Sequence, residues 1–361
     1  MQLRIPGPTP LPDEVLQAMK RQMINHRGPQ FAEMFHEVTA TLKEMFQTKG
    51  DLLILTGSGT GGMEASIVNT LSPGDKVLSL SNGAFGERFA DIAEAFGAQV
   101  ERLRFEWGRA VDPQAVRQAL SHDTGIKAVL VTHNETSTGV TNDLASISAV
   151  VREFEKLLLV DAISSLGAID LPVDAWGCDV VITGSQKAWM APPGLAMVSV
   201  SERAWQAHAQ ARMPRCYWDF ARAKRFLEKG QTPWTPALST IYALAAALEL
   251  LQREGLKNIV ARHARVGAKA REGVKSLGLS LFPEDSYASN TVTAVRAPEG
   301  LDVKRLLKSL REEYNTILAG GQQRLEGKIF RIGHLGYVNE DDIEAVLEAL
   351  RVALPQAGFN G

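Results

Sequence analysis

The 361-residue chain lacks the marks of a disulfide-bonded, zinc-binding or membrane-spanning protein. Its only two cysteines, Cys178 and Cys216, are too few for a disulfide framework or a zinc site and suit a reducing compartment. No apolar run reaches the roughly 18 residues of a membrane span. The first residues, MQLRIPGPTPLP, are interrupted by prolines and contain no apolar stretch typical of a signal peptide. We therefore expect a cytoplasmic protein without a metal site.

An excess of charge of one sign is also absent. The 39 lysines and arginines are balanced by 41 acidic residues, which leaves a formal net charge of −2. Proteins that bind nucleic acids or anionic membranes usually carry a basic patch, so we expect neither partner. Hydrophobic residues make up 45% of the chain, which is enough for a large core. At roughly 100–200 residues per domain, two or three domains are expected.

Short apolar runs alternate with amphipathic stretches between residues 50 and 200. Strands that are apolar on both faces and separated by helices are typical of an α/β fold with a mostly parallel sheet. The seven predicted strands are residues 52–55, 76–81, 100–105, 127–133, 157–163, 180–185 and 195–201. The predicted helices between them include residues 63–71, 85–96, 113–120 and 144–154.

The alternation changes near residue 235, where a long helix is predicted over residues 237–251. We divide the chain into an extended, proline-rich N-terminal segment (1–14), a large domain (15–254) and a small α+β domain (255–361). The elements predicted in the small domain are helices 259–277, 303–314 and 340–350 and strands in LSLF, NTVTAV and GKIFRIG.

Polar, glycine-rich stretches follow five of the predicted strands. They read TGSGTGG, SNGAFGER, THNETSTG, VDAISS and TGSQK. In an open α/β sheet, ligands bind beyond the carboxyl ends of the strands. A bare scaffold does not need so many loop-forming polar residues there, so we expect a ligand site at these strand ends.

TGSGTGG, residues 56–62, follows a strand and opens a helix, which favours binding of an anion such as phosphate. A dinucleotide-binding loop would need an acidic residue at the end of the next strand, but Ser81 and Asn82 stand there. A Walker A loop would need Lys-Ser/Thr after its last glycine, where the chain has Met63 and Glu64. A phosphate-binding loop and a plain turn both remain open.

Lys187 and Asp161 each follow an apolar strand. Lys187 precedes the turn Pro192-Pro193-Gly194, and a lysine held at the strand ends would have a lowered pKa and a nucleophilic amine. An exposed loop lysine is the alternative. Asp161 follows four apolar residues and needs a cationic or hydrogen-bonding partner, such as a protonated pyridine nitrogen. It could also cap a helix.

Three further side chains allow two interpretations each. Phe85 could stack on a flat ring or belong to the core. Arg331, inside an apolar strand, could bind a carboxylate or form a structural salt bridge. His133 could be a general base, but the sequence favours a structural histidine because no partner accompanies it.

Taken in chain order, these motifs resemble the fold-type I enzymes that use pyridoxal 5'-phosphate (PLP). GSQKAWMAPPG, VDAISSLGA and FRIGHLG resemble the class V aminotransferases, and within them the alanine–glyoxylate and serine–pyruvate aminotransferases. The resemblance extends from PGPTPLP to RIGHLG, which is nearly the whole chain. It implies a large domain with a mostly parallel seven-stranded sheet and a smaller C-terminal domain.

The resemblance implies a role for several residues. Lys187 matches the Schiff-base lysine, Asp161 the acid at the pyridine nitrogen, and Arg331 the arginine that binds the substrate carboxylate. Gly7 matches a glycine at the substrate end of the N-terminal segment, which would contribute to the active site. The implied cofactor-binding residues are Ser58, Gly59, Thr60, Phe85, Thr136, Asp161, Ile163, Ser185, Gln186, Lys187, Thr232 and Thr235.

Departures from the family pattern occur at Thr60, which is histidine in some members, and at Thr232, where some relatives have tyrosine. Thr235 matches a threonine that reaches the phosphate of the neighbouring subunit, so a homodimer with its site at the interface is implied.

The implied activity is the transfer of an amino group from alanine or serine to glyoxylate or pyruvate by a ping-pong mechanism. One alternative is a lyase or cysteine desulfurase, but Gln186 stands where those enzymes have histidine, and residues 316–323 contain no cysteine. An NAD-dependent oxidoreductase is another alternative, but the chain lacks the acidic residue that would bind the ribose. A non-catalytic protein of the same fold is the remaining alternative.

Overall fold

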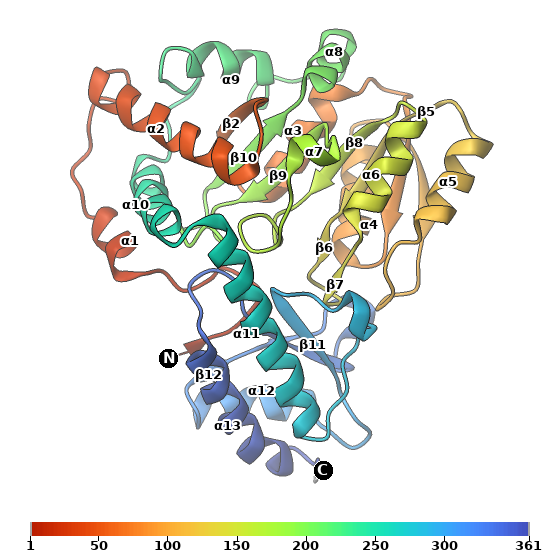
Figure 1. Cartoon of the computed structure of the whole chain (residues 1–361), viewed down its shortest axis with the longest axis vertical. Helices are drawn as coiled ribbons and strands as arrows, with labels where there is room; N and C mark the ends of the chain where they lie inside the picture. Colours follow the sequence, from red (N-terminus) through yellow and green to blue (C-terminus); the bar gives the residue numbers. More distant parts are fainter. Residues whose placement is uncertain (1, 360–361) are drawn as a thin grey trace.

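A seven-stranded sheet forms the centre of the larger part of the molecule (Figure 1). The computed structural model describes residues 2–359. The strand order is β2-β10-β9-β8-β5-β3-β4, and only β10 runs antiparallel to its neighbours. The strands are β2 (Asp51–Thr56), β3 (Lys76–Ser81), β4 (Gln99–Arg104), β5 (Ile126–Thr132), β8 (Leu157–Asp161), β9 (Val180–Gly184) and β10 (Leu195–Val200). The predicted α/β fold with a mostly parallel sheet is confirmed.

Helices cover both faces of this sheet because its strands are apolar on both sides. In β5, Val129 and Val131 belong to one hydrophobic cluster, whereas Ala128 and Leu130 belong to another. The first cluster includes side chains of α2 (Pro29–Phe46), α5 (Pro113–His122), α6 (Leu144–Glu153) and α10 (Leu238–Glu254). The second includes side chains of α3 (Gly59–Thr70), α4 (Ala84–Ala95), α8 (Glu202–Gln210) and α9 (Phe220–Leu227).

The C-terminal part has a three-stranded sheet and a hydrophobic cluster of its own. The sheet order is β11-β14-β13, and the two residues of β1 pair with β12 in a separate parallel ladder. The elements are β1 (Gln2–Leu3), α11 (Leu256–Ser276), β11 (Val292–Arg296), α12 (Val303–Glu312), β12 (Thr316–Ile317), β13 (Ala319–Gly320), β14 (Ile329–Gly333) and α13 (Glu340–Gln356). Figure 1 shows this part beneath the larger one, with the N-terminus beside β12.

Three local predictions need correction. Residues 279–282 form only an isolated bridge between Leu281 and Val295 instead of a strand. The helix predicted to end at residue 314 ends at Glu312. The N-terminal segment is not extended throughout: it bends at residues 5–8, and α1 (Asp13–Ala18) begins before its predicted end. The division into domains stays a prediction.

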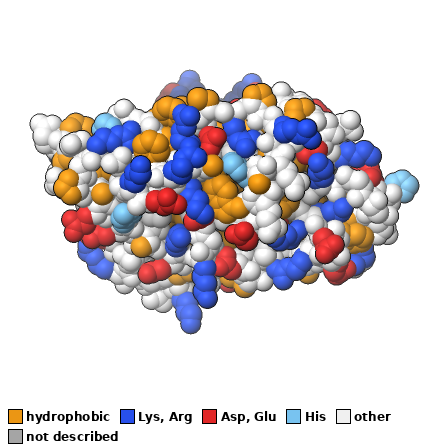
Figure 2. Space-filling model, turned by 90° about the horizontal axis from the view of Figure 1, so that it is seen from above, with side chains coloured by type: hydrophobic (Ala, Val, Ile, Leu, Met, Phe, Trp, Pro, Cys, Tyr) orange, Lys and Arg blue, Asp and Glu red, His pale blue; other side chains and the backbone are white. Residues whose placement is uncertain are grey.

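Several short elements have no clear periodic pattern and were not predicted. They are α1, α7 (Val173–Trp176), the two-residue strands β1, β6 (Asn134–Glu135), β7 (Val140–Thr141), β12 and β13, and the 3-10 turns Asp285–Tyr287 and Gln323–Leu325. The longer helices α2, α8 and α9 were not predicted either. Among residues 2–359, no helix has the length and apolar character needed to cross a membrane. Figure 2 shows basic and acidic side chains interspersed over the visible face, as the balanced composition predicts.

Two histidines are fully buried between α11 and the end of β14. His263 contacts the Ile259 carbonyl oxygen through Nδ1 (2.8 Å) and accepts a hydrogen bond from the Gly336 N–H through Nε2 (3.1 Å). This pattern requires a neutral ring, because a protonated Nε2 cannot accept. Burial lowers the pKa of His263 to about 4 and that of His334 to about 3.

These buried histidines predict that acid destabilises the fold. In the unfolded chain they bind protons below a pKa of 6.5, whereas in the folded chain they do so only near pH 4 or 3. The two histidines therefore make their full contribution to the free energy of unfolding above about pH 6.5. This contribution falls as the pH decreases, by about 2 kcal/mol per histidine at pH 5. Urea unfolding curves at several pH values measure this slope. His334→Gln should reduce the slope of unfolding free energy against pH, whereas replacement of the exposed His122 by Gln should not. An equal slope in the wild type and both variants would contradict the prediction.

Candidate active site

A cavity of about 160 Å³ lies at the carboxyl ends of the central strands. Its lining comes from segments that follow β2, β3, β5, β8 and β9, which are the five polar strand ends noted in the sequence. The lining residues are Ser58, Gly59, Thr60, Met63, Phe85, Arg88, Asn134, Thr136, Asp161, Ile163, Ser164, Gln186 and Lys187. Nine of the predicted site residues, from Ser58 to Lys187, thus lie around one space.

The phosphate-loop candidate occupies the first turn of α3. Ser58 is the N-cap, and its Oγ accepts a hydrogen bond from the Gly61 N–H (3.4 Å). The first N–H groups of a helix have no partner within the helix, so they are available to an anion. A Cβ on Gly59 would lie 2.5 Å from Cδ1 of Ile163, so a larger residue here would displace the Ile163 side chain. The loop therefore presents backbone donors directly to the cavity.

Lys187 lies in the turn after β9, and the N-terminal segment holds it there. Its Nζ donates a hydrogen bond to the Pro6 carbonyl oxygen (2.5 Å). Thr9 holds the same turn, because its Oγ1 donates to the Lys187 carbonyl oxygen (3.0 Å). Burial lowers the pKa of Lys187 to about 8. The exposed-loop alternative is therefore wrong for this lysine.

Asp161 is buried at the end of β8. One oxygen accepts a hydrogen bond from the Ile163 N–H (3.0 Å), and the other lies 3.5 Å from Thr132 Oγ1. Asp161 forms no ion pair with any residue from 2 to 359. Burial raises the pKa of Asp161 to about 6. A turn follows it instead of a helix, so the helix-cap alternative is wrong, and the carboxylate is available to a cationic ligand.

Phe85 stands at the start of α4 and faces the cavity instead of the core. The guanidinium of Arg88, one turn later in α4, lies 4.7 Å from the centre of its ring. Arg88 also lines the cavity and was not predicted. Its spacing of three residues from Phe85 is the signal that could have identified it, because such residues share a helix face.

Arg331 is buried in β14 and contacts the rim of the cavity. Its Nε donates to the Gly320 carbonyl oxygen (2.9 Å), and its Nη1 donates to the Thr136 carbonyl oxygen (3.1 Å). It forms no salt bridge with the described residues, so the alternative that Arg331 forms a structural salt bridge is wrong. Burial lowers the pKa of Arg331 to about 10, which leaves it charged at neutral pH.

His133 has the structural role that the sequence favours. It is buried, its Nδ1 lies 3.0 Å from Ser165 Oγ, and its ring packs edge-on against Trp176. Burial lowers the pKa of His133 to about 4, so it is neutral near pH 7.

Ser185 does not line the cavity. Its Oγ donates to the Pro192 carbonyl oxygen (2.6 Å) and accepts from the Leu195 N–H (3.2 Å), so it stabilises the Pro-Pro-Gly turn. Gln186 does line the cavity, and its side-chain Oε1 is buried without a hydrogen-bond partner.

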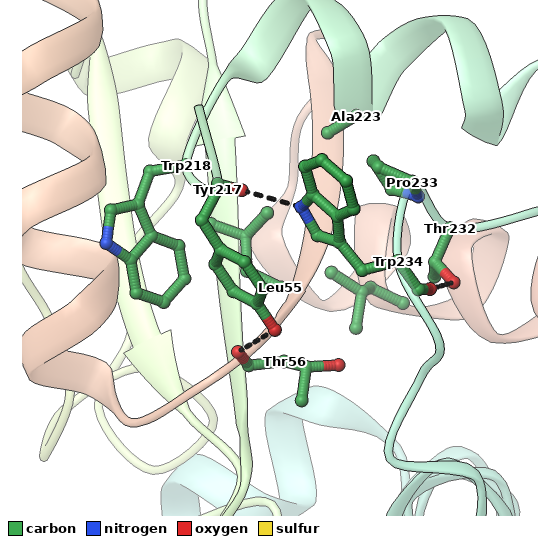
Figure 3. A pocket seen from close by; sticks show the side chains of 9 residues that line it. Leu55, Thr56, Tyr217, Trp218, Ala223, Thr232, Pro233 and Trp234 are labelled. Atoms are coloured by element: carbon green, nitrogen blue, oxygen red, sulfur yellow. Dashed lines mark hydrogen bonds between the residues drawn. The ribbon is translucent and has the colours of Figure 1, made fainter. Parts of the chain in front are cut away.

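Thr232 and Thr235 lie outside the cavity of their own chain. Thr232 donates to the Trp234 carbonyl oxygen (2.6 Å), and Thr235 is exposed. Figure 3 shows Thr232 and Trp234 beside Tyr217 and Thr56, where the rings of Tyr217 and Trp234 stack 5.7 Å apart. The single chain therefore does not bring these two threonines to Lys187.

Comparisons with known proteins agree with this geometry. The model of the family described as Aminotransferase class-V matches residues 2–346. The chain is 45% identical over 361 residues to the soluble hydrogenase 42 kDa subunit of Anabaena cylindrica, covering 99% of this chain and 94% of that protein. It is 39% identical over 366 residues to a serine–glyoxylate aminotransferase of Hyphomicrobium methylovorum, covering 99% and 90%. The crystal structure of alanine–glyoxylate aminotransferase from Nostoc sp. is similar with a TM-score of 0.94 and 33% identity, covering 98% of this chain and 94% of that chain.

The fit of Lys187 against Gly7 can be tested by substitution. A Cβ on Gly7, which has a φ of 131°, would lie 2.7 Å from Lys187 Nζ. Gly7→Ala should therefore displace either the lysine or the N-terminal segment, with a loss of about 1–3 kcal/mol from strain at positive φ. In the cofactor-free Gly7→Ala variant, acylation of Lys187 should be faster than in the wild type, as measured by mass spectrometry.

Gly74→Ala is the matched control for this experiment. Gly74 also has a positive φ, 84°, but nothing lies within 4 Å of its added Cβ. It should lose stability without changing the acylation rate of Lys187. Equal acylation rates in Gly7→Ala and in the control would show that Gly7 does not hold the lysine.

Proposed function

The chain belongs to the class V aminotransferase family, and on that basis we propose that it transfers an amino group from alanine or serine to glyoxylate or pyruvate. The family implies PLP as the cofactor. The observation that carries the proposal is the cavity that holds the Lys187 amine, the Asp161 carboxylate and the first turn of α3. The alanine and serine donors rest on the names of relatives, and the acceptor is a small 2-oxo acid.

The residues around the cavity fit PLP. The free N–H groups at Ser58, Gly59 and Thr60 suit its phosphate, and the close packing of Gly59 leaves room only for backbone there. Asp161 is a buried carboxylate without a cationic partner, which suits a protonated pyridine nitrogen. Phe85, Ile163 and Thr136 line the same cavity, and the first two would supply apolar surface for the ring. Gln186 Oε1 remains free for a donor.

Bound PLP supplies an electron-withdrawing ring that stabilises negative charge at the substrate Cα. Asp161, with a pKa of about 6, is ionised at neutral pH and would hold the proton on the ring nitrogen. Lys187, with a pKa of about 8, is near the range in which an amine both accepts and returns a proton. We assign it the proton transfer at the substrate Cα. Its depressed pKa results from burial beside the cavity.

Arg331 would bind the substrate carboxylate. Nε and Nη1 of its guanidinium are fixed by backbone carbonyl oxygens, whereas Nη2 makes no hydrogen bond with the residues from 2 to 359. A fixed guanidinium with one free edge can bind a carboxylate with little loss of side-chain entropy. Gly7 lies beside Lys187 and would leave space for the substrate at that end of the N-terminal segment.

A homodimer would explain the positions of Thr232 and Thr235. Neither lines the cavity of its own chain: Thr235 is exposed, and Thr232 lies two residues before Trp234, whose ring stacks on that of Tyr217. In a dimer, residues 232–235 would approach the phosphate in the neighbouring subunit. We propose a cytoplasmic homodimer in which each active site uses residues of both chains.

Replacement of Lys187 tests the catalytic assignment. Lys187→Ala should lose the yellow absorbance of the bound cofactor and reduce transamination by at least about 10²-fold, because it removes the amine to which the proton transfer at Cα is assigned. Absorbance spectra and single-turnover rates measure both effects. The exposed Lys229→Ala should behave as wild type. Full activity in Lys187→Ala would rule out the assignment.

The substrate proposal predicts a preference among acceptors. Alanine and serine should react faster with glyoxylate and pyruvate than with 2-oxoglutarate, in a panel of donor and acceptor pairs monitored by product formation. Ping-pong kinetics should give parallel double-reciprocal lines. A strong preference for 2-oxoglutarate would overturn the substrate assignment and leave the cofactor assignment intact.

A further inference from the structure

A fully buried carboxylate, Glu135, lies behind the cavity without forming an ion pair among the described residues. It is the second residue of β6. Its Oε2 accepts hydrogen bonds from the N–H groups of Phe85 and Gly86, both at 3.0 Å. Its Oε1 accepts from the N–H and the Oγ of Ser137, at 3.0 and 2.5 Å. Four donors thus converge on one side chain, which is the arrangement that an ionised buried carboxylate requires.

These bonds replace a missing helix cap. The N-cap of α4 is Gly83, which has no side chain to bond the free N–H groups of the first turn. Glu135 bonds two of them from another segment, and Ser137 Oγ bonds a third, that of Ala84 (2.9 Å). A Cβ on Gly83 would collide with the Glu135 carboxyl group. Glycine at the cap therefore makes room for a cap supplied from β6 and the turn after it.

Glu135 is connected to three groups of the active site. It bonds the backbone of Phe85, whose ring faces the cavity. The next residue, Thr136, lines the cavity, and its carbonyl oxygen accepts from Arg331 Nη1 (3.1 Å). A displacement of Glu135 would therefore move the aromatic ring and the guanidinium relative to each other.

The charge of Glu135 also acts on the site. Its negative charge contributes to the raised pKa of Asp161, after the larger effect of burial. It favours the charged form of Arg331, against the burial that lowers the pKa of that arginine. Burial raises the pKa of Glu135 itself, whereas its hydrogen bonds from Ser137, Gly86 and Phe85 favour the ionised form. Among the described residues, Arg331 has no carboxylate in direct contact.

We propose that Glu135 is a positioning residue of the active site, which fixes the Phe85 ring and the Arg331 guanidinium around the bound cofactor and substrate. The proposal rests on the proposed function for the role of Arg331. The effect on Phe85 does not depend on the proposed function, because contact between the Phe85 ring and the cofactor requires only that PLP is bound. The two parts are therefore measured separately.

Glu135→Gln is the informative variant, because it keeps the shape of the side chain but replaces one acceptor oxygen by a donor. Either the Phe85 and Gly86 N–H groups or the Ser137 donors then face an NH2 group. Glu87→Gln is the matched control, since Glu87 also lies in the first turns of α4 but bonds Ser81 and Arg104 instead of the site. Both variants lose one negative charge from the same region.

The readouts separate positioning from stability. Glu135→Gln should weaken PLP binding tenfold or more and change the circular dichroism of the bound cofactor, which reports ring orientation. It should also raise KM for the amino donor more than it lowers kcat. Glu87→Gln should leave all three at wild-type values, even if both variants have a lower melting temperature.

If Glu135→Gln does not fold, Ser137→Ala gives a milder version, because it removes one bond to Oε1 and the bond to Ala84. It should shift cofactor binding and circular dichroism in the same direction. Unchanged cofactor binding and circular dichroism in whichever Glu135 or Ser137 variant folds, or equal changes in Glu87→Gln, would overturn the proposal. If only the substrate proposal fails, the wild type will show no transamination with these substrates. PLP binding and circular dichroism will still differ between Glu135→Gln and Glu87→Gln.

Discussion

The burial of the central strands on both faces is the constraint on which the rest of the structure depends. Successive side chains of β5 enter two different hydrophobic clusters, so helices must cover both sides of the sheet. Most polar side chains of this region therefore lie beyond the strand ends. Because β3, β5, β8 and β9 run parallel, their carboxyl ends lie at one edge, and their polar loops meet there with that of β2. The cavity is a consequence of how the sheet is covered.

The charged groups around this cavity do not form direct ion pairs with one another. Lys187, Asp161, Glu135 and Arg331 are held mainly by hydrogen bonds to the protein backbone or to hydroxyl groups. A direct ion pair would use up the charge that a ligand needs. Backbone acceptors and donors fix the position of each group and leave its charge available for a cofactor or substrate of opposite sign.

The N-terminal segment joins the two parts of the molecule at the site. The Arg4 carbonyl oxygen accepts a hydrogen bond from the Gly333 N–H at the end of β14 (2.7 Å), and the Pro6 carbonyl oxygen accepts from Lys187. The strand that carries Arg331 and the turn that carries Lys187 are therefore connected through a few residues. A change in the position of the small C-terminal sheet would therefore be transmitted to the Lys187 amine. Under the proposed function, this contact would couple the residue that binds substrate to the residue that transfers the proton.

The sequence by itself determined the seven strands, the strand-end motifs and, through family resemblance, the class V assignment and PLP. Short apolar runs and glycine-rich turns are local patterns, so they are visible along the chain. Only the tertiary structure placed Pro6 against Lys187, 181 residues away, and the Glu135 carboxylate at the start of α4. It also showed that Ser185 stabilises a turn and that Arg88 faces the cavity. Hydrogen bonds between distant segments leave no periodic trace in the sequence, because each partner alone is an ordinary residue.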